Sequence, residues 1–234
     1  MAMRLISLCL AVFVALSGCS ENQVKKDVVF TKASPDSVLV FGLLLNTPFP
    51  NPEFTFRKYD PLTGKPSLTE TFKAQPPGSN WLASGGIGQY NVQSYFVLNM
   101  PAGHWFLECI RVGKIDSVSS YNHILCPSND SLAFKLIPGE ATYIGEYYFY
   151  SETMGIVQFD LIGGDVGRAN QKIAEYKNIT SPLVTQEPNS ATYNCVKKRV
   201  GLIGYECNMK TAILKIKSPK AVRKPTDIKM KISY

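Results

Sequence analysis

Two histidines and two cysteines in the middle of the chain carry side chains that could bind a metal ion. They are His104, Cys109, His123 and Cys126. Imidazole nitrogens and thiolates suit zinc, but the spacing His-x4-Cys followed by His-x2-Cys is loose for zinc, whose usual ligand pairs are closer. The alternative chemistry for the two thiols is a disulfide. The cellular compartment helps to decide between a metal site and a disulfide, because disulfides persist only where the surroundings are oxidising.

The first residues indicate export. A short start with one positive charge, Arg4, precedes an apolar run from Leu5 to Leu16 that is broken only by Ser7. This is the layout of a secretory signal peptide, and the run is about half of the ~20 residues that a membrane-spanning helix needs. The ending Leu16-Ser17-Gly18-Cys19 resembles a bacterial lipoprotein signal. The resemblance implies cleavage before Cys19 and a lipid on Cys19. Ser20 after the cysteine, rather than Asp, favours the outer membrane, so we predict a lipid-anchored envelope protein that faces the periplasm.

Export favours disulfides for the remaining cysteines. Cys9 leaves with the signal peptide and Cys19 carries the lipid. Four cysteines remain, and we favour the pairs Cys109–Cys126 and Cys195–Cys207, because each closes a short local loop. A loop of about 15 residues would contribute ~3 kcal/mol in the chain-entropy model. A metal site formed by His104, Cys109, His123 and Cys126 stays the alternative.

Catalytic arrangements are sparse. A serine nucleophile needs a nearby base, the chain has only two histidines, and Ser84 lacks the first glycine of G-x-S-x-G. Glu146 and Glu152 could form an acid pair for sugar chemistry, but we expect them to be scattered surface carboxylates. We therefore predict no catalytic residue and no cofactor.

Aromatic residues are concentrated in Tyr147-Tyr148-Phe149-Tyr150. Alternate residues of a strand face opposite sides. We expect Tyr147 and Phe149 in the core, which leaves Tyr148 and Tyr150 on the outer face as a candidate binding patch.

The positive charge gathers at the C-terminal end. From Lys210 onward there are eight basic residues and one acidic residue, so this stretch carries the whole formal net charge of +7. An acidic polymer or lipid headgroups could bind such a segment, whereas nucleic acid is not expected outside the cytoplasm. The candidate binding residues here are Lys215, Lys217, Lys220, Arg223 and Lys224.

Apolar patterning predicts a mainly β fold. Val38–Leu45 is a continuous apolar run of strand length, and Glu53–Tyr59 alternates like a half-buried strand. Further strands are expected with turn signals between them, which is typical of a sandwich or barrel. Asp165–Lys177 has helical spacing behind an N-cap residue. The further strands are Thr69–Ala74, Gln93–Asn99, His104–Val112, Ser131–Ile137, Ala141–Tyr150 and Ile156–Ile162, followed by a hairpin over Tyr193–Lys217.

The segment Phe134-Lys135-Leu136-Ile137-Pro138-Gly139-Glu140, continued by Tyr143-Ile144-Gly145, resembles uncharacterised bacterial lipoproteins with a small prealbumin-like β-sandwich. The resemblance covers residues 37–162 and implies a fold and an envelope address, with no catalytic residues. The predicted fold is thus an antiparallel β-sandwich with one helix and a C-terminal hairpin. The expected boundaries are 1–18 signal peptide, 19–36 tether, 37–162 β-sandwich, 163–217 helix and hairpin, and 218–234 basic tail.

These observations predict a binding protein rather than an enzyme. The favoured function is a non-catalytic envelope interaction or scaffold protein, held to the membrane by its lipid and binding an envelope protein or an acidic polymer. The alternative is a carrier of a small ligand or of a metal held by the histidine and cysteine set. An envelope hydrolase is the third hypothesis.

Overall fold

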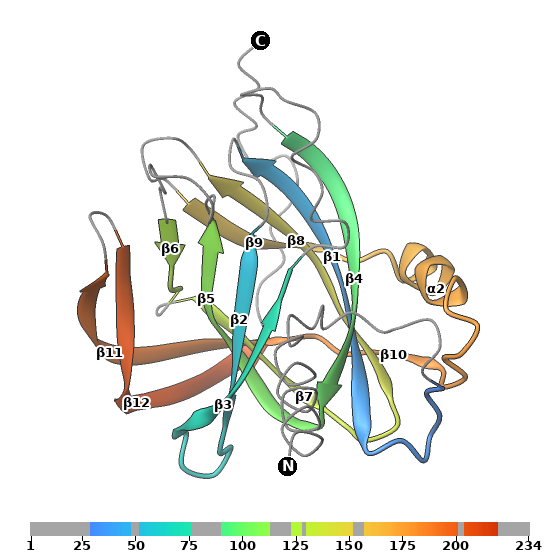
Figure 1. Ribbon diagram of the computed structural model, residues 1–234, viewed down its shortest axis with the longest axis horizontal. Helices are drawn as coiled ribbons and strands as arrows, with labels where there is room; N and C mark the ends of the chain where they lie inside the picture. The colour runs from blue at the N-terminus through green and yellow to red at the C-terminus, as the bar shows by residue number, and fades with distance from the viewer. Residues whose placement is uncertain are drawn as a thin grey trace, which may run out of the picture.

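A computed structural model describes residues 29–47, 52–75, 90–112, 123–127, 130–151, 157–200 and 204–219. Two β-sheets pack face to face (Figure 1). The first contains β1 (Asp36–Thr47), β4 (Tyr90–Pro101), β8 (Ala141–Ser151), β9 (Val157–Gly163) and β10 (Leu183–Thr185). The second contains β2 (Glu53–Tyr59), β3 (Pro66–Ala74), β5 (Gly103–Val112), β6 (His123–Leu125), β7 (Ser131–Leu136), β11 (Asn189–Val200) and β12 (Gly204–Pro219). The predicted β-sandwich with a helix and a C-terminal hairpin is confirmed.

Strand β1 lies inside the first sheet, whose order is β10-β8-β1-β4 with β9 also paired to β8. It pairs antiparallel with β4 and parallel with β8, and β10 is also parallel to β8. The first sheet is therefore mixed, whereas every pair in the second sheet is antiparallel. Strands with both faces covered read as continuous apolar runs, which explains the sequence from Val38 to Leu43.

The main core fills the space between the two sheets. Phe41 of β1 stacks on Phe96 of β4 at 4.5 Å between ring centroids and meets Phe54 of β2 edge-on at 5.8 Å. Tyr147 stacks on Phe159 of β9 at 4.9 Å. Such aromatic pairs contribute about 0.5–1.5 kcal/mol each beyond the area they bury.

A helix covers the outer face of the first sheet. Helix α2 (Val166–Ala174) buries Ala169 and Ile173 in a cluster with Val38 and Val40 of β1. Asp165 caps its N-terminus by accepting a hydrogen bond from the Arg168 amide at 3.1 Å. The helix occupies the right side of Figure 1.

The C-terminal hairpin extends and covers the second sheet, whose order is β12-β11-β7-β5-β2-β3 with β6 also paired to β5. Strand β11 pairs with β7 over only three residues, Asn189 to Ala191. Beyond them, Tyr193 packs on the outer side of Phe106 with ring centroids 5.3 Å apart. Ala212 and Leu214 of β12 join the same cluster. Both sheets therefore have an apolar outer face that another element buries.

Candidate functional site

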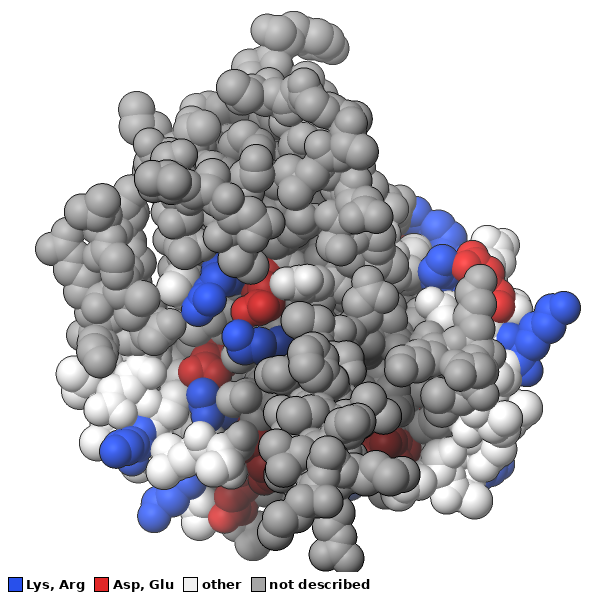
Figure 2. Space-filling view, in the orientation of Figure 1, with Lys and Arg blue, Asp and Glu red and all other residues white. Residues whose placement is uncertain are grey.

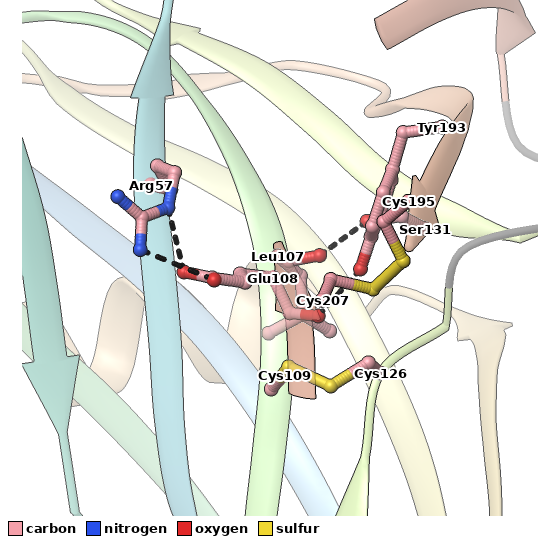
Figure 3. The surroundings of a disulfide bond; sticks show 9 residues. All are labelled: Arg57, Leu107, Glu108, Cys109, Cys126, Ser131, Tyr193, Cys195 and Cys207. Carbon is pink, nitrogen blue, oxygen red and sulfur yellow. Dashed lines mark hydrogen bonds and ion pairs between the residues drawn. A yellow bond between two sulfur atoms is a disulfide. The ribbon is translucent and has the colours of Figure 1, made fainter. Parts of the chain in front are cut away.

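The four cysteines of the described residues form two disulfides, Cys109–Cys126 and Cys195–Cys207, as the sequence predicts (Figure 3). The first joins β5 to the residue after β6, and the second joins the strands of the C-terminal hairpin. Because the first disulfide uses both thiols, the metal alternative built on His104, Cys109, His123 and Cys126 has no thiolate left and is wrong.

His104 has a packing role instead. Its ring meets the Tyr59 ring edge-on at 5.8 Å between centroids. Partial burial, with a smaller contribution from Lys135, lowers the pKa of His104, and Asp60 opposes that shift. The side chain of His123 lies outside the described residues.

The edge of β5 that pairs with β6 and β7 has a gap in its pairing near Cys109, whereas the other edge pairs with β2. Strand β7 pairs with β5 up to Phe106, and β6 begins to pair only at Ile110. Within the gap, two carbonyls accept hydrogen bonds from side-chain hydroxyls (Figure 3): the Leu107 carbonyl from Ser131, and the Glu108 carbonyl from Tyr193 at 2.7 Å. These bonds matter because a buried unpaired carbonyl would be destabilising.

Glu108 also forms a buried ion pair with Arg57. A β-bulge opposite Thr55 and Phe56 occurs at Glu108. Its side chain is 10% exposed and that of Arg57 is 14% exposed. Arg57 Nε donates to Glu108 Oε2 at 2.8 Å and Nη2 donates to Oε1 at 3.1 Å, while Nη1 donates to the Ser67 carbonyl at 2.7 Å. Both carboxylate oxygens are thus engaged, and the pair joins β2, β3 and β5.

Glu146 is a second buried acid, so our expectation of a surface carboxylate is wrong. It is 6% exposed and accepts a hydrogen bond from the Tyr95 hydroxyl. Arg168 Nη2 of α2 lies 3.3 Å from its other oxygen, and Arg168 Nε lies 2.9 Å from Asp165. The backbone at Gly42 passes so close that a Cβ there would lie 2.7 Å from Glu146 Cγ. Glu146 therefore fastens the helix to the first sheet. Glu152, the other acid considered for such a pair, lies outside the described residues.

The candidate tyrosine patch is not an exposed surface. Tyr147 and Phe149 face the main core as predicted, but Tyr148 is only 3% exposed and Tyr150 is half-buried. Their rings stack at 6.2 Å between centroids. Tyr148 lies between Leu44 of β1 and Asp160 of β9, so neighbours on both sides limit what a partner could reach. The prediction of Tyr148 as an exposed contact is wrong.

Lys215 and Lys217 are exposed on β12. The strand alternates there, with Ala212 and Leu214 buried and Ile213 and Lys215 outward. On the left side of Figure 2, Lys and Arg side chains alternate with Asp and Glu side chains, and three basic residues of β2 and β3, Arg57, Lys58 and Lys73, form ion pairs. The other predicted site residues, Cys19, Lys220, Arg223 and Lys224, lie outside the described residues.

Comparison with protein-family models, with curated proteins and with solved structures found no match to this chain. Within the described part of the chain, no helix is both long enough and apolar enough to cross a membrane. The geometry itself defines a disulfide-linked β-sandwich in which the buried acids Glu108 and Glu146 hold elements together. The exposed basic strand β12 is the predicted binding element that the structure leaves accessible.

The Arg57–Glu108 pair can be tested with a neighbouring pair as control. We expect Arg57→Met to lower the free energy of unfolding by about 3–5 kcal/mol, because it leaves the Glu108 charge buried alone. Arg57→Met with Glu108→Met should recover most of that loss, since it leaves no unpaired charge. Lys58→Met, which breaks the exposed pair with Glu70, should cost less than about 1 kcal/mol. Urea unfolding measures all three. Equal losses for Arg57→Met and Lys58→Met would contradict a structural role for the buried pair.

The buried tyrosines predict a loss of stability in alkali. Burial, with help from the nearby Glu146 charge, raises the pKa of Tyr143 to about 12. Burial also raises the pKa of Tyr147 and Tyr193 well above the ordinary value of a tyrosine. Unfolded tyrosines ionise near pH 10, so above that pH the unfolded state holds fewer protons than the folded state. The free energy of unfolding should therefore fall as pH rises from about 10 to 12.

Urea unfolding at a series of alkaline pH values measures this fall. Tyr193→Phe should make it shallower, because one ionising group is removed. At neutral pH the same variant should cost about 1–3 kcal/mol, because the Glu108 carbonyl loses its donor. A stability that stays constant across this pH range would refute the prediction.

Proposed function

We propose that the chain is a lipid-anchored protein of the bacterial cell envelope that acts by binding rather than by catalysis. In this proposal Cys19 carries the lipid, the sandwich faces the periplasm from the outer membrane, and a basic surface contacts acidic envelope material, either a protein or a polymer.

The observation that carries this proposal is the exposure of the lysines on β12. Lys210, Lys215 and Lys217 are all exposed. The placed side chains of the hairpin, residues 189–196 and 207–217, include no Asp or Glu. The strand leads directly into residues 220–234, which add five basic residues against one acid. Each basic group near an anionic surface contributes about 1 kcal/mol, so this arrangement suits an acidic partner.

The two disulfides support the proposed compartment. Disulfides persist in oxidising surroundings such as the periplasm and are rare in the cytosol. The disulfide Cys109–Cys126 joins β5 to the residue that follows β6. The disulfide Cys195–Cys207 joins β11 to β12, the strand that carries the lysines. The disulfides therefore fit a periplasmic protein, and Cys195–Cys207 stabilises the hairpin that carries the proposed binding surface.

The small-ligand alternative receives less support. A cavity of about 290 Å³ lies between Lys32, Gly139 and Val184, slightly below the usual size of small-molecule sites. Lys32 and Val184 are themselves exposed, so the cavity would cover only part of a ligand. We therefore place the function on the basic surface.

The lipid can be tested through two cysteines of the N-terminal segment. When the full chain is produced in a bacterium that processes lipoproteins, we expect mass spectrometry to find a chain that begins at Cys19 and carries lipid. Cys19→Ala should remove the lipid mass, because the acylated thiol is lost. Cys9→Ala, which changes a residue ahead of the cleavage site, should leave it. A Cys19→Ala protein with the same mass increment as the parent chain would refute lipidation at Cys19.

The basic surface can be tested with poly-glutamate as the probe. For the mature chain with Cys19→Ser, we expect Lys215→Ala with Lys217→Ala to weaken binding roughly 30-fold, at about 1 kcal/mol per lysine. Binding should also weaken as salt rises. Lys172→Ala with Lys177→Ala, in and just after the helix on the other side of the sandwich, is the control with the same charge change. Calorimetric titration measures the affinities, and equal losses for the two double variants would contradict a basic site on β12.

A further inference from the structure

The turn between β2 and β3 exposes a leucine almost completely. Leu62 lies at the tip of the turn from Asp60 to Lys65 and is 94% exposed. Single exposed apolar residues are common on protein surfaces, so exposure alone indicates no function. Two further features of Leu62 point to a function: hydrogen bonds fix the turn that carries it, and that turn contacts β12.

The turn is held rigidly by its own hydrogen bonds. Asp60 Oδ1 accepts from the Leu62 amide at 2.9 Å, and Asp60 Oδ2 accepts from the Thr63 hydroxyl at 2.8 Å. The Asp60 amide donates to the Lys65 carbonyl at 3.0 Å, and the Gly64 amide donates to the Asp60 carbonyl at 2.8 Å. These bonds fix the backbone on both sides of Leu62, so its outward position is part of the fold.

The turn is also fastened to β12. The Leu214 amide donates to the Gly64 carbonyl at 2.8 Å. Gly64 has a φ of +67°, and a Cβ there would lie 2.3 Å from the Leu214 carbonyl oxygen, so glycine is required for this approach. The same Cβ position lies 3.4 Å from Ile213 Cγ2. The turn that carries Leu62 is therefore held against β12 next to Ile213, which is itself 53% exposed.

Three exposed lysines belong to the turn and to β12. Lys65 is the last residue of the turn, and Lys215 and Lys217 lie on the same face of β12 as Ile213 because side chains repeat every second residue. The one acid of the turn, Asp60, uses both carboxylate oxygens to accept hydrogen bonds within it. We call Leu62, Lys65, Ile213, Lys215 and Lys217 the Leu62 surface.

We propose that the Leu62 surface docks on an anionic lipid bilayer, with Leu62 entering the interface and the lysines contacting the headgroups. This inference rests on the proposed function and names the acidic partner of its basic surface. Long lysine side chains suit the position because their apolar stems can lie along the acyl boundary while the charge stays among the headgroups. A lipid on Cys19 would hold the surface near a membrane and raise its effective concentration there.

The shape of the surface favours a bilayer over a protein partner. Leu62 projects from the tip of a turn, so a protein would need a matching pocket to bury it, whereas the interfacial region of a bilayer accepts an apolar side chain without one. Burial of apolar area together with attraction to anionic lipid is the combination that holds proteins at membrane surfaces. A protein partner with an acidic pocket is the competing explanation, and the experiment below separates the two.

The test uses the mature chain with Cys19→Ser and two kinds of vesicle, one of equal parts phosphatidylglycerol and phosphatidylcholine and one of phosphatidylcholine alone. We expect sedimentation binding to the anionic vesicles only. Leu62→Ser should weaken this binding at least about tenfold, the equivalent of burying one leucine. Val166→Ser, which changes an exposed aliphatic residue of α2 over the outer face of the other sheet, should leave it unchanged. In Leu62→Trp, the tryptophan emission should shift to shorter wavelength on adding anionic vesicles.

The outcomes separate this inference from the proposed function. If Leu62→Ser binds vesicles as tightly as the parent chain while Lys215→Ala with Lys217→Ala does not, insertion is overturned and the basic surface stands. If the parent chain binds poly-glutamate and ignores anionic vesicles, the bilayer is overturned as the partner and a protein or polymer takes its place. If it binds neither probe, both the inference and the proposed basic surface fail. Leu62 is almost fully exposed, so its replacement should not affect folding, which urea unfolding of each variant will check.

Discussion

The burial of β1 on both of its faces is the constraint on which the other layers depend. One face, with Leu39, Phe41 and Leu43, fills the core between the sheets. The other face, with Val38 and Val40, would be apolar and open without a cover. Helix α2 supplies that cover, and Glu146 fastens it through Arg168. The continuous apolar run of a central strand therefore requires a helix outside the sheet and a buried charge to hold it.

The second sheet meets the same requirement with a hairpin. Phe106 and Tyr59 face outward, and β11 can cover them only by leaving its short pairing with β7 and crossing the sheet. Between Phe106 and Ile110, β5 pairs with β2 on one edge, while its other edge has no strand partner among the described residues. On that edge, the carbonyls of Leu107 and Glu108 accept hydrogen bonds from the hydroxyls of Ser131 and Tyr193. The Glu108 side chain pairs with Arg57. The charged and polar groups that look most like an active site are thus consequences of packing.

The sequence predicts what depends on local pattern. Strand β2 runs from Glu53 to Tyr59 as its alternation predicts, and the two disulfides were predictable from the expected export and the short loops. The helix ends three residues before the expected Lys177, because the amide of Tyr176 bonds to the Ile173 carbonyl and tightens the last turn. Strands β6 and β10, of three residues each, are too short for any periodicity to appear.

What depends on distant contacts could not be predicted. Glu108 and Glu146 are ordinary acids in the sequence, and only the bulge at Glu108 and the arrival of Arg168 from α2 explain their burial. Alternation predicts the outer face for Tyr148, but the sequence does not show that β9 and β1 flank it on both sides. The outward lysines of β12 were predictable from alternation and charge, whereas their contact with the β2–β3 turn needs the fold.

Covering both outer faces decides where a partner can bind. Where α2 and the hairpin cover the sheets, a partner cannot reach the strands beneath them, so contact there must use the covering elements, the sheet edges or the turn tips. The free edge of β12 would invite pairing with another strand, but the carbonyl of Gly64 already accepts the amide of Leu214 on that edge. The same contact that protects the edge holds the β2–β3 turn, with Leu62 at its tip, against β12. A single backbone hydrogen bond, from the Leu214 amide to the Gly64 carbonyl, therefore has two effects. It discourages strand addition at this point, and it holds the turn that carries Leu62 against the strand that carries Lys215 and Lys217.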